Sequence, residues 1–208
     1  MDWKNESGNM IHHPCVSEKR QHLKNTKERR ETNEKNKTMN EKKKKWRQIR
    51  SKVNRLADSL GRRIDVKIRE SVTALLSLDF NVSASCTGHT RRGIAAPWID
   101  IGEDIPITQI KRKSKRELKI LKAKNLREQE RLMELLDEFY RGKEVPNDIR
   151  LVLEQRGIYG NARLVSTGER FQEIRPKRER EERLEQYREE MRQFTEFLKQ
   201  KYFDIAEP

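Results

Sequence analysis

Apolar residues are sparse in this chain, and over most of its length they recur every three or four positions instead of forming continuous runs. That spacing puts them on one narrow face of a helix. It predicts helices over 46–60, 63–79, 113–141 and 176–203, the first two either separated at Gly61 or joined as one bent helix. Such a chain must assemble its core from several narrow helical stripes and from the strands that the remaining segments supply.

Four shorter segments alternate apolar and polar residues, which is the period of a strand. They cover residues 80–86, 97–102, 149–155 and 162–166. A glycine-containing loop joins the first two strands as a hairpin, and a turn with Gly157 and Gly160 joins the last two. We therefore expect an α+β fold, in which a small antiparallel sheet of about four short strands packs with long amphipathic helices.

The composition explains why the stripes are narrow, because 39% of the residues are charged and only 33% are hydrophobic. Residues 1–45 hold thirteen Lys and Arg against seven Asp and Glu, and few large apolar side chains. This predicts a disordered basic tail, followed by an α+β core domain over 46–175 and a charged C-terminal helix over 176–208. Met39 is an alternative start, so whether residues 1–38 belong to the native protein stays open.

The chain shows no secretory signal and no apolar run of the roughly 20 residues that a membrane helix needs. Its two cysteines, Cys15 and Cys86, form no disulfide framework. We therefore expect a cytoplasmic protein with no membrane partner. A metal site formed by His12, His13 and Cys15 would have to order a flexible tail at its own entropic cost.

The loop Ser85–Gly93 has the composition of a functional site, and Cys86 and His89 are its candidate catalytic residues. The imidazole could activate the thiol as a nucleophile, with Arg91 holding a substrate carboxylate or phosphate. Alternatively, the thiol and imidazole are two ligands of one metal ion, completed by an acid near the second strand: Asp100, Glu103 or Asp104. In a purely structural interpretation, Cys86 is a small buried residue and the glycines form turns.

Anion binding is a further interpretation of the same loop. Its backbone and side chains offer anion-binding groups at Thr87, Gly88, Thr90, Arg91 and Arg92, and a net charge of +14 attracts polyanions such as RNA or DNA. Trp98, just beyond the loop, is either a platform on which a base stacks or a core anchor. The loop matches neither the Walker A motif nor GxGxxG, so the cofactor is unknown.

The last predicted helix carries a heptad-like apolar seam formed by Leu184, Tyr187, Met191, Phe194 and Leu198. We expect this coiled-coil-like seam to pack along the helix of residues 113–141 or to mediate self-association. A helical protein–protein interaction module is accordingly a third functional hypothesis.

Two resemblances accompany these patterns. Ser85-Cys86-Thr87-Gly88-His89 followed by Pro97-Trp98 resembles a motif of uncharacterised small bacterial and phage proteins, over residues 70–102, and implies no activity. Ala84-Ser85-Cys86-Thr87-Gly88 is also similar to a loop of the tRNA wybutosine-synthesis methyltransferase family, which has Arg where this chain has His89. That likeness implies a methyl donor or a tRNA partner.

The sequence thus favours a protein that binds a polyanion, nucleic acid or nucleotide, through a basic surface and the Cys86–Arg92 loop. An enzyme that uses Cys86 and His89, with or without a metal, is the alternative, and whether any reaction is catalysed stays open.

Overall fold

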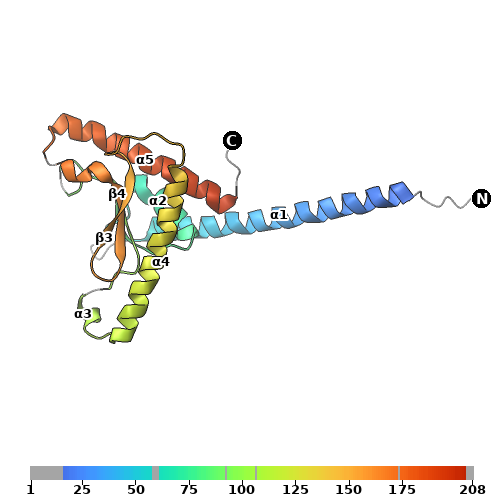
Figure 1. Cartoon of the computed structure of the whole chain (residues 1–208), viewed down its shortest axis with the longest axis horizontal. Coiled ribbons are helices and arrows are strands. Elements are labelled where there is room, and N and C mark those ends of the chain that lie inside the picture. The colour runs from blue at the N-terminus through green and yellow to red at the C-terminus, as the bar shows by residue number, and fades with distance from the viewer. Residues whose placement is uncertain (1–15, 58–60, 92, 106, 173, 205–208) are drawn as a thin grey trace, which may run out of the picture. The chain divides into compact units, whose positions relative to one another are not determined.

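The computed structural model describes residues 16–57, 61–91, 93–105, 107–172 and 174–204 (Figure 1). The chain divides into two compact units, residues 1–43 and 44–208. Helix α1 (Val16–Arg55) begins in the first unit and ends in the second. The sheet and all later helices belong to the second unit, in which the C-terminal helix is part of the same body as the strands.

The predicted tail over residues 1–45 is described from Val16, and there its backbone is helical. Helix α1 holds sixteen Lys and Arg against five Glu, so most of its length has no apolar stripe that packing could stabilise. Only its last turns carry one, where Trp46 and Val53 are buried in the second unit. His12, His13 and Cys15 lie outside the described residues.

A turn replaces the first part of the helix predicted over 63–79. Gly61 has a φ of +73°, and Ala57 and Arg63 form an isolated antiparallel bridge. The chain then makes a single 3₁₀ turn, η1 (Val66–Ile68), before helix α2 (Arg69–Ser77). The turn separates α2 from α1, so the bent-helix alternative is wrong.

The four predicted strands are present as β1 (Val82–Cys86), β2 (Trp98–Ile101), β3 (Leu151–Arg156) and β4 (Asn161–Ser166). They form one antiparallel sheet in the order β1-β2-β4-β3, with Cys86 opposite Trp98. The predicted α+β class and the two hairpins are therefore confirmed.

One face of the sheet packs against helices and forms part of the hydrophobic core. Ile99, Ile101 and Leu164 are almost fully buried there against α2, α4 (Lys115–Phe139) and α5 (Lys177–Phe203). Figure 1 shows α4 running beside β3 and β4. Because side chains alternate along a strand, the other face carries Cys86 and Trp98. The short elements α3 (Ile107–Ile110) and η2 (Thr167–Phe171) follow β2 and β4.

Two polar residues that interrupt the apolar stripe of α4 fasten this helix to the sheet. Asn125 accepts a hydrogen bond from the Glu103 N–H (2.9 Å) and donates to the Tyr159 carbonyl (2.9 Å). Glu128 accepts hydrogen bonds from the backbone and the side chain of Asn81. Both residues are buried, and they satisfy partly buried backbone groups just before β1, just after β2 and in the turn between β3 and β4.

The apolar seam of α5 belongs to the core, and all five of its residues are buried. Helix α5 packs mainly against α2, where the hydroxyls of Ser71 and Thr195 are 2.7 Å apart. Only the end of α4 reaches it, through Phe139 and Phe194. The expectation that the seam runs along α4 is wrong, and a coiled coil is not supported. Self-association stays a prediction, although these side chains already have partners within the chain.

Among the described residues, no helix is both long and apolar enough to cross a membrane.

Candidate functional site

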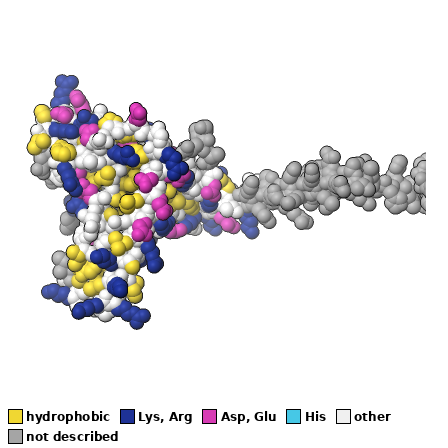
Figure 2. All heavy atoms as spheres, in the orientation of Figure 1, with side chains coloured by type: hydrophobic (Ala, Val, Ile, Leu, Met, Phe, Trp, Pro, Cys, Tyr) yellow, Lys and Arg dark blue, Asp and Glu magenta, His cyan; other side chains and the backbone are white. Residues whose placement is uncertain are grey.

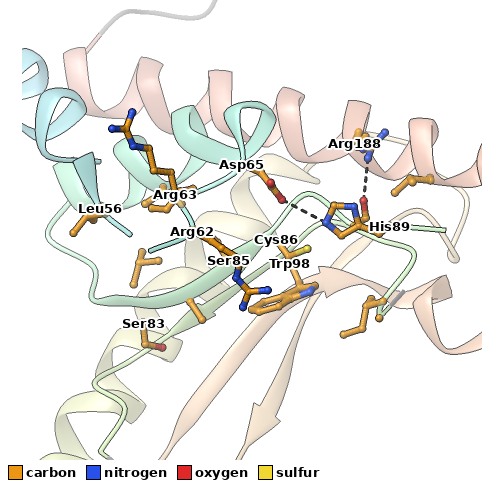
Figure 3. A pocket seen from close by; sticks show the side chains of 18 of the residues that line it. Leu56, Arg62, Arg63, Asp65, Ser83, Ser85, Cys86, His89, Trp98 and Arg188 are labelled. Carbon is orange, nitrogen blue, oxygen red and sulfur yellow. Dashed lines mark hydrogen bonds and ion pairs between the residues drawn. The ribbon is translucent and has the colours of Figure 1, made fainter. Parts of the chain in front are cut away.

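A cavity of about 1480 Å³ opens beside the exposed face of β1 (Figure 3). The cavity is lined by β1 and α2, by the end of α1 with the turn that follows, by the loop between β1 and β2, and by the first half of α5. Its lining is mixed: Leu76, Val82 and Leu184 are apolar, whereas Lys52, Arg63 and Arg91 are cationic. The loop singled out by sequence therefore forms one wall of this cavity.

Cys86 and His89 do converge, and Asp65 joins them. One ligand atom from each of the three residues lies within 4.8 Å of the other two. The Asp65 Oδ2 and His89 Nε2 atoms are 3.6 Å apart, and Figure 3 shows the carboxylate and the imidazole directed at each other above Cys86. Asp65 and Cys86 are half-buried and His89 is exposed, so the cluster sits at the surface of the cavity.

Contacts with the neighbouring backbone fix this convergence. Thr87 is buried and donates to Asp65 Oδ2 through its hydroxyl (3.2 Å) and its N–H (3.4 Å). Arg188 of α5 donates to the carbonyls of Thr87 (3.1 Å) and Gly88 (3.0 Å). The His89 N–H donates to the Ile94 carbonyl (3.0 Å), which closes the loop on itself. The loop that carries Cys86 and His89 is therefore anchored both to Asp65 and to α5.

The environment of Cys86 disfavours its thiolate. Burial raises the pKa of the Cys86 thiol above its ordinary value, and the nearby Asp65 carboxylate acts in the same direction. A hydrogen bond from the Gly88 backbone and the charges of Arg163 and Arg188 oppose this effect without cancelling it. With no cation at the cluster, the thiol is protonated at neutral pH and is a weak nucleophile.

The three acids that the sequence offered as further metal ligands do not join the cluster of Asp65, Cys86 and His89. Asp100 makes a bidentate ion pair with Arg163, with bonds of 2.6 and 2.7 Å. Glu103 pairs with Lys124 of α4 (3.2 Å), and Asp104 is exposed and does not line the cavity. These acids follow β2 or sit in its middle, whereas the cluster forms at the far end of the hairpin.

Backbone N–H groups of the loop that the sequence offered for anion binding are in part already hydrogen-bonded within the chain. Gly88 is buried, and the N–H groups of Thr87 and His89 already have the acceptors described above. Thr90 and Arg91 do line the cavity. Arg92 lies outside the described residues. The amides of Thr87 and His89 therefore add nothing to the attraction for an anion.

Three cations on the cavity wall have no carboxylate partner within the part of the chain that the structure describes: Lys52, Arg63 and Arg91. Arg62 extends from the same turn as Arg63 toward the ring of Trp98 (Figure 3). Trp98 is half-buried and lines the cavity, with the Arg163 guanidinium 3.8 Å from its ring centroid. An aromatic ring and several cations thus share one hollow with the Asp65 cluster.

Sequence reasoning missed Asp65 because it placed this residue inside the helix predicted over 63–79, as one of many charged side chains there. Here the Asp65 side chain makes no capping hydrogen bond to η1 and turns toward Thr87 instead. Arg188 could not be singled out from the sequence, because α5 contains many other charged residues. Only the tertiary fold brings these residues to the loop.

Searches against protein-family models, curated proteins and solved structures found no match to this chain. The resemblances of residues 70–102 therefore stay predictions.

Proposed function

We propose that this protein binds single-stranded nucleic acid in the cavity between the turn after α1 and the β1–β2 loop. The observation that carries the proposal is the set of cations without carboxylate partners (Lys52, Arg63 and Arg91) around a hollow that also exposes Trp98. Single strands are bound by grooves that combine positive charge for the phosphates with aromatic rings for the bases.

The size of the cavity favours a strand over a free nucleotide. Small-molecule sites measure roughly 300–1,000 Å³, and this cavity measures about 1480 Å³. Its apolar walls provide a surface for bases, and its cations come from the end of α1, the turn after it and the β1–β2 loop. Cations from several segments of the wall could each neutralise a different phosphate of one backbone.

Positive charge elsewhere would support encounter with a polyanion. Helix α1 alone has a net charge of +11. Figure 2 shows Lys and Arg side chains gathered at the end of the second unit where α3 and α4 meet. The residues of this basic turn are Lys111, Arg112, Lys113, Lys115 and Arg116. Exposed charge of this kind binds nucleic acid with little sequence preference and steers its approach.

The proposal is tested by titrating a fluorescently labelled single strand into the full chain at several salt concentrations. The logarithm of the binding constant should fall linearly with the logarithm of the salt concentration, with a slope of about −0.7 per phosphate neutralised. Arg63→Gln and Arg91→Gln should each make the slope shallower by about 0.7, because each removes one phosphate contact.

The matched control is Arg141→Gln, which removes an exposed arginine that does not line the cavity. We expect this variant to retain the wild-type slope. If Arg63→Gln and Arg91→Gln behave like the control, or if the wild-type affinity does not depend on salt, the cavity is not a nucleic-acid site.

A further inference from the structure

We propose that Asp65, Cys86 and His89 are three ligands of one divalent transition-metal ion, best matched by Zn²⁺, with the fourth coordination position open to the cavity. The inference does not depend on nucleic-acid binding. It rests on three ligand atoms of different chemistry within 4.8 Å of one another, from two segments of the chain.

The distances suit a tetrahedral ion. Zinc lies about 2.0–2.3 Å from nitrogen, oxygen and sulfur ligands, so neighbouring ligand atoms are about 3.5 Å apart. The Asp65 Oδ2 and His89 Nε2 atoms are already 3.6 Å apart, and the cluster as a whole would contract slightly around an ion. Because His89 and Asp65 are partly exposed, small movements of both side chains suffice.

The arrangement differs from a catalytic relay of thiol, imidazole and carboxylate. In a relay, the thiol and the carboxylate contact opposite nitrogens of the ring, and this keeps them apart. Here a single ring nitrogen is near both partners, and the thiol and carboxylate are also near each other. Three groups directed at a common point fit an ion between them.

The charges of the three ligands and the hydrogen bonds from the neighbouring Thr87 also suit a divalent ion. A carboxylate and a thiolate beside a neutral imidazole carry two negative charges, which neutralise a divalent cation in a half-buried place. The ion would displace the Cys86 proton to solvent and remove the repulsion between the thiolate and Asp65. Thr87 holds the Asp65 carboxylate through two hydrogen bonds, as outer-shell residues of metal sites do.

The test uses the full chain after treatment with a chelator. The chain should bind one Zn²⁺ ion at the cluster, and Co²⁺ at the same site should give a thiolate-to-metal charge-transfer band. Cys86→Ser, His89→Gln and Asp65→Asn should each weaken binding by at least tenfold, since even outer-shell substitutions cost roughly 10–100-fold. Cys86→Ser should also abolish the charge-transfer band.

Two control variants make the result specific. Glu181→Gln alters another acid of the cavity wall and should leave Zn²⁺ affinity unchanged. A triple variant, His12→Asn with His13→Asn and Cys15→Ser, removes the chain's other cysteine and the two histidines nearest to it, and should retain the Co²⁺ band. Circular dichroism melting curves check that every variant is folded.

Protection of the thiol gives an independent readout. Bound Zn²⁺ should slow alkylation of Cys86 by iodoacetamide at least tenfold, as followed by mass spectrometry of the peptide that contains it. The proposal is overturned if the chelator-treated wild type binds no Zn²⁺ at micromolar concentrations, or if the three cluster variants bind it as the wild type does. It is also overturned if Zn²⁺ leaves the alkylation rate of Cys86 unchanged.

Discussion

Gly88 determines the path of the loop that carries the candidate site. Its φ of +76° lies in the left-handed region, and a Cβ atom there would be 2.5 Å from the Ala96 carbonyl carbon and 2.8 Å from Leu184 Cδ1. Only glycine combines this dihedral angle with so close an approach of the second half of the loop and α5. Cys86 and His89 can therefore face one point because Gly88, one of the two residues between them, has no side chain.

Gly88→Ala should consequently lower the free energy of unfolding by about 2–5 kcal/mol, from left-handed strain together with overpacking. Gly93→Ala is the matched comparison, because Gly93 has a φ of +68° but no atom within 4 Å of the added Cβ. Strain alone should cost about 1–2 kcal/mol there. Urea denaturation measures both values, and equal losses would contradict the close packing described at Gly88.

At the scale of elements, polar contacts hold α4 in place in addition to its apolar stripe. A capping box begins this helix: the Ser114 hydroxyl accepts a hydrogen bond from the Glu117 N–H (3.2 Å), and the Glu117 carboxylate accepts one from the Ser114 N–H (2.8 Å). Farther along, Asn125 and Glu128 satisfy backbone groups at the edges of the sheet. The capping box and the hydrogen bonds of Asn125 and Glu128 together fix the register of α4 against the strands.

Asn125→Ala should therefore destabilise the second unit by about 1–3 kcal/mol, because it leaves partly buried backbone groups of Glu103 and Tyr159 without these partners. Glu130→Ala alters an exposed residue of the same helix and should change stability by less than about 0.5 kcal/mol. Thermal denaturation of both variants checks this. Similar melting temperatures would mean that Asn125 does not anchor α4.

The sequence predicted which segments form helices and strands better than it predicted which of these elements pack together. Strand alternation located β1 to β4, and helical spacing located α4 and α5, because both patterns are local consequences of burying one face. The same spacing could not show that α5 packs on α2, since an apolar seam fits any complementary stripe. Cys86 and His89 were found through their spacing in one loop, whereas Asp65 and the cavity cations depend on tertiary folding.

At the scale of the whole molecule, positive charge is unevenly distributed along the chain. Helix α1 holds +11 of the total +14, so the rest of the protein is close to balanced. Two of the cavity cations without carboxylate partners, Arg63 and Arg91, lie in that nearly neutral remainder, and the third, Lys52, lies in the last turn of α1. We therefore propose that α1 provides a general attraction for polyanions and that the cavity, which Lys52 of α1 also lines, makes the selective contact with a strand.

Photocrosslinking tests that assignment most directly. A single strand carrying photoreactive uridines would be irradiated with the full chain, and the modified peptides would be identified by mass spectrometry. We predict adducts on Trp98 and on the loop from Cys86 to Arg91, lost on addition of excess unlabelled strand. Adducts confined to Val16–Lys43 and to the basic turn of residues 111–116 would contradict the account, because the strand would then bypass the cavity.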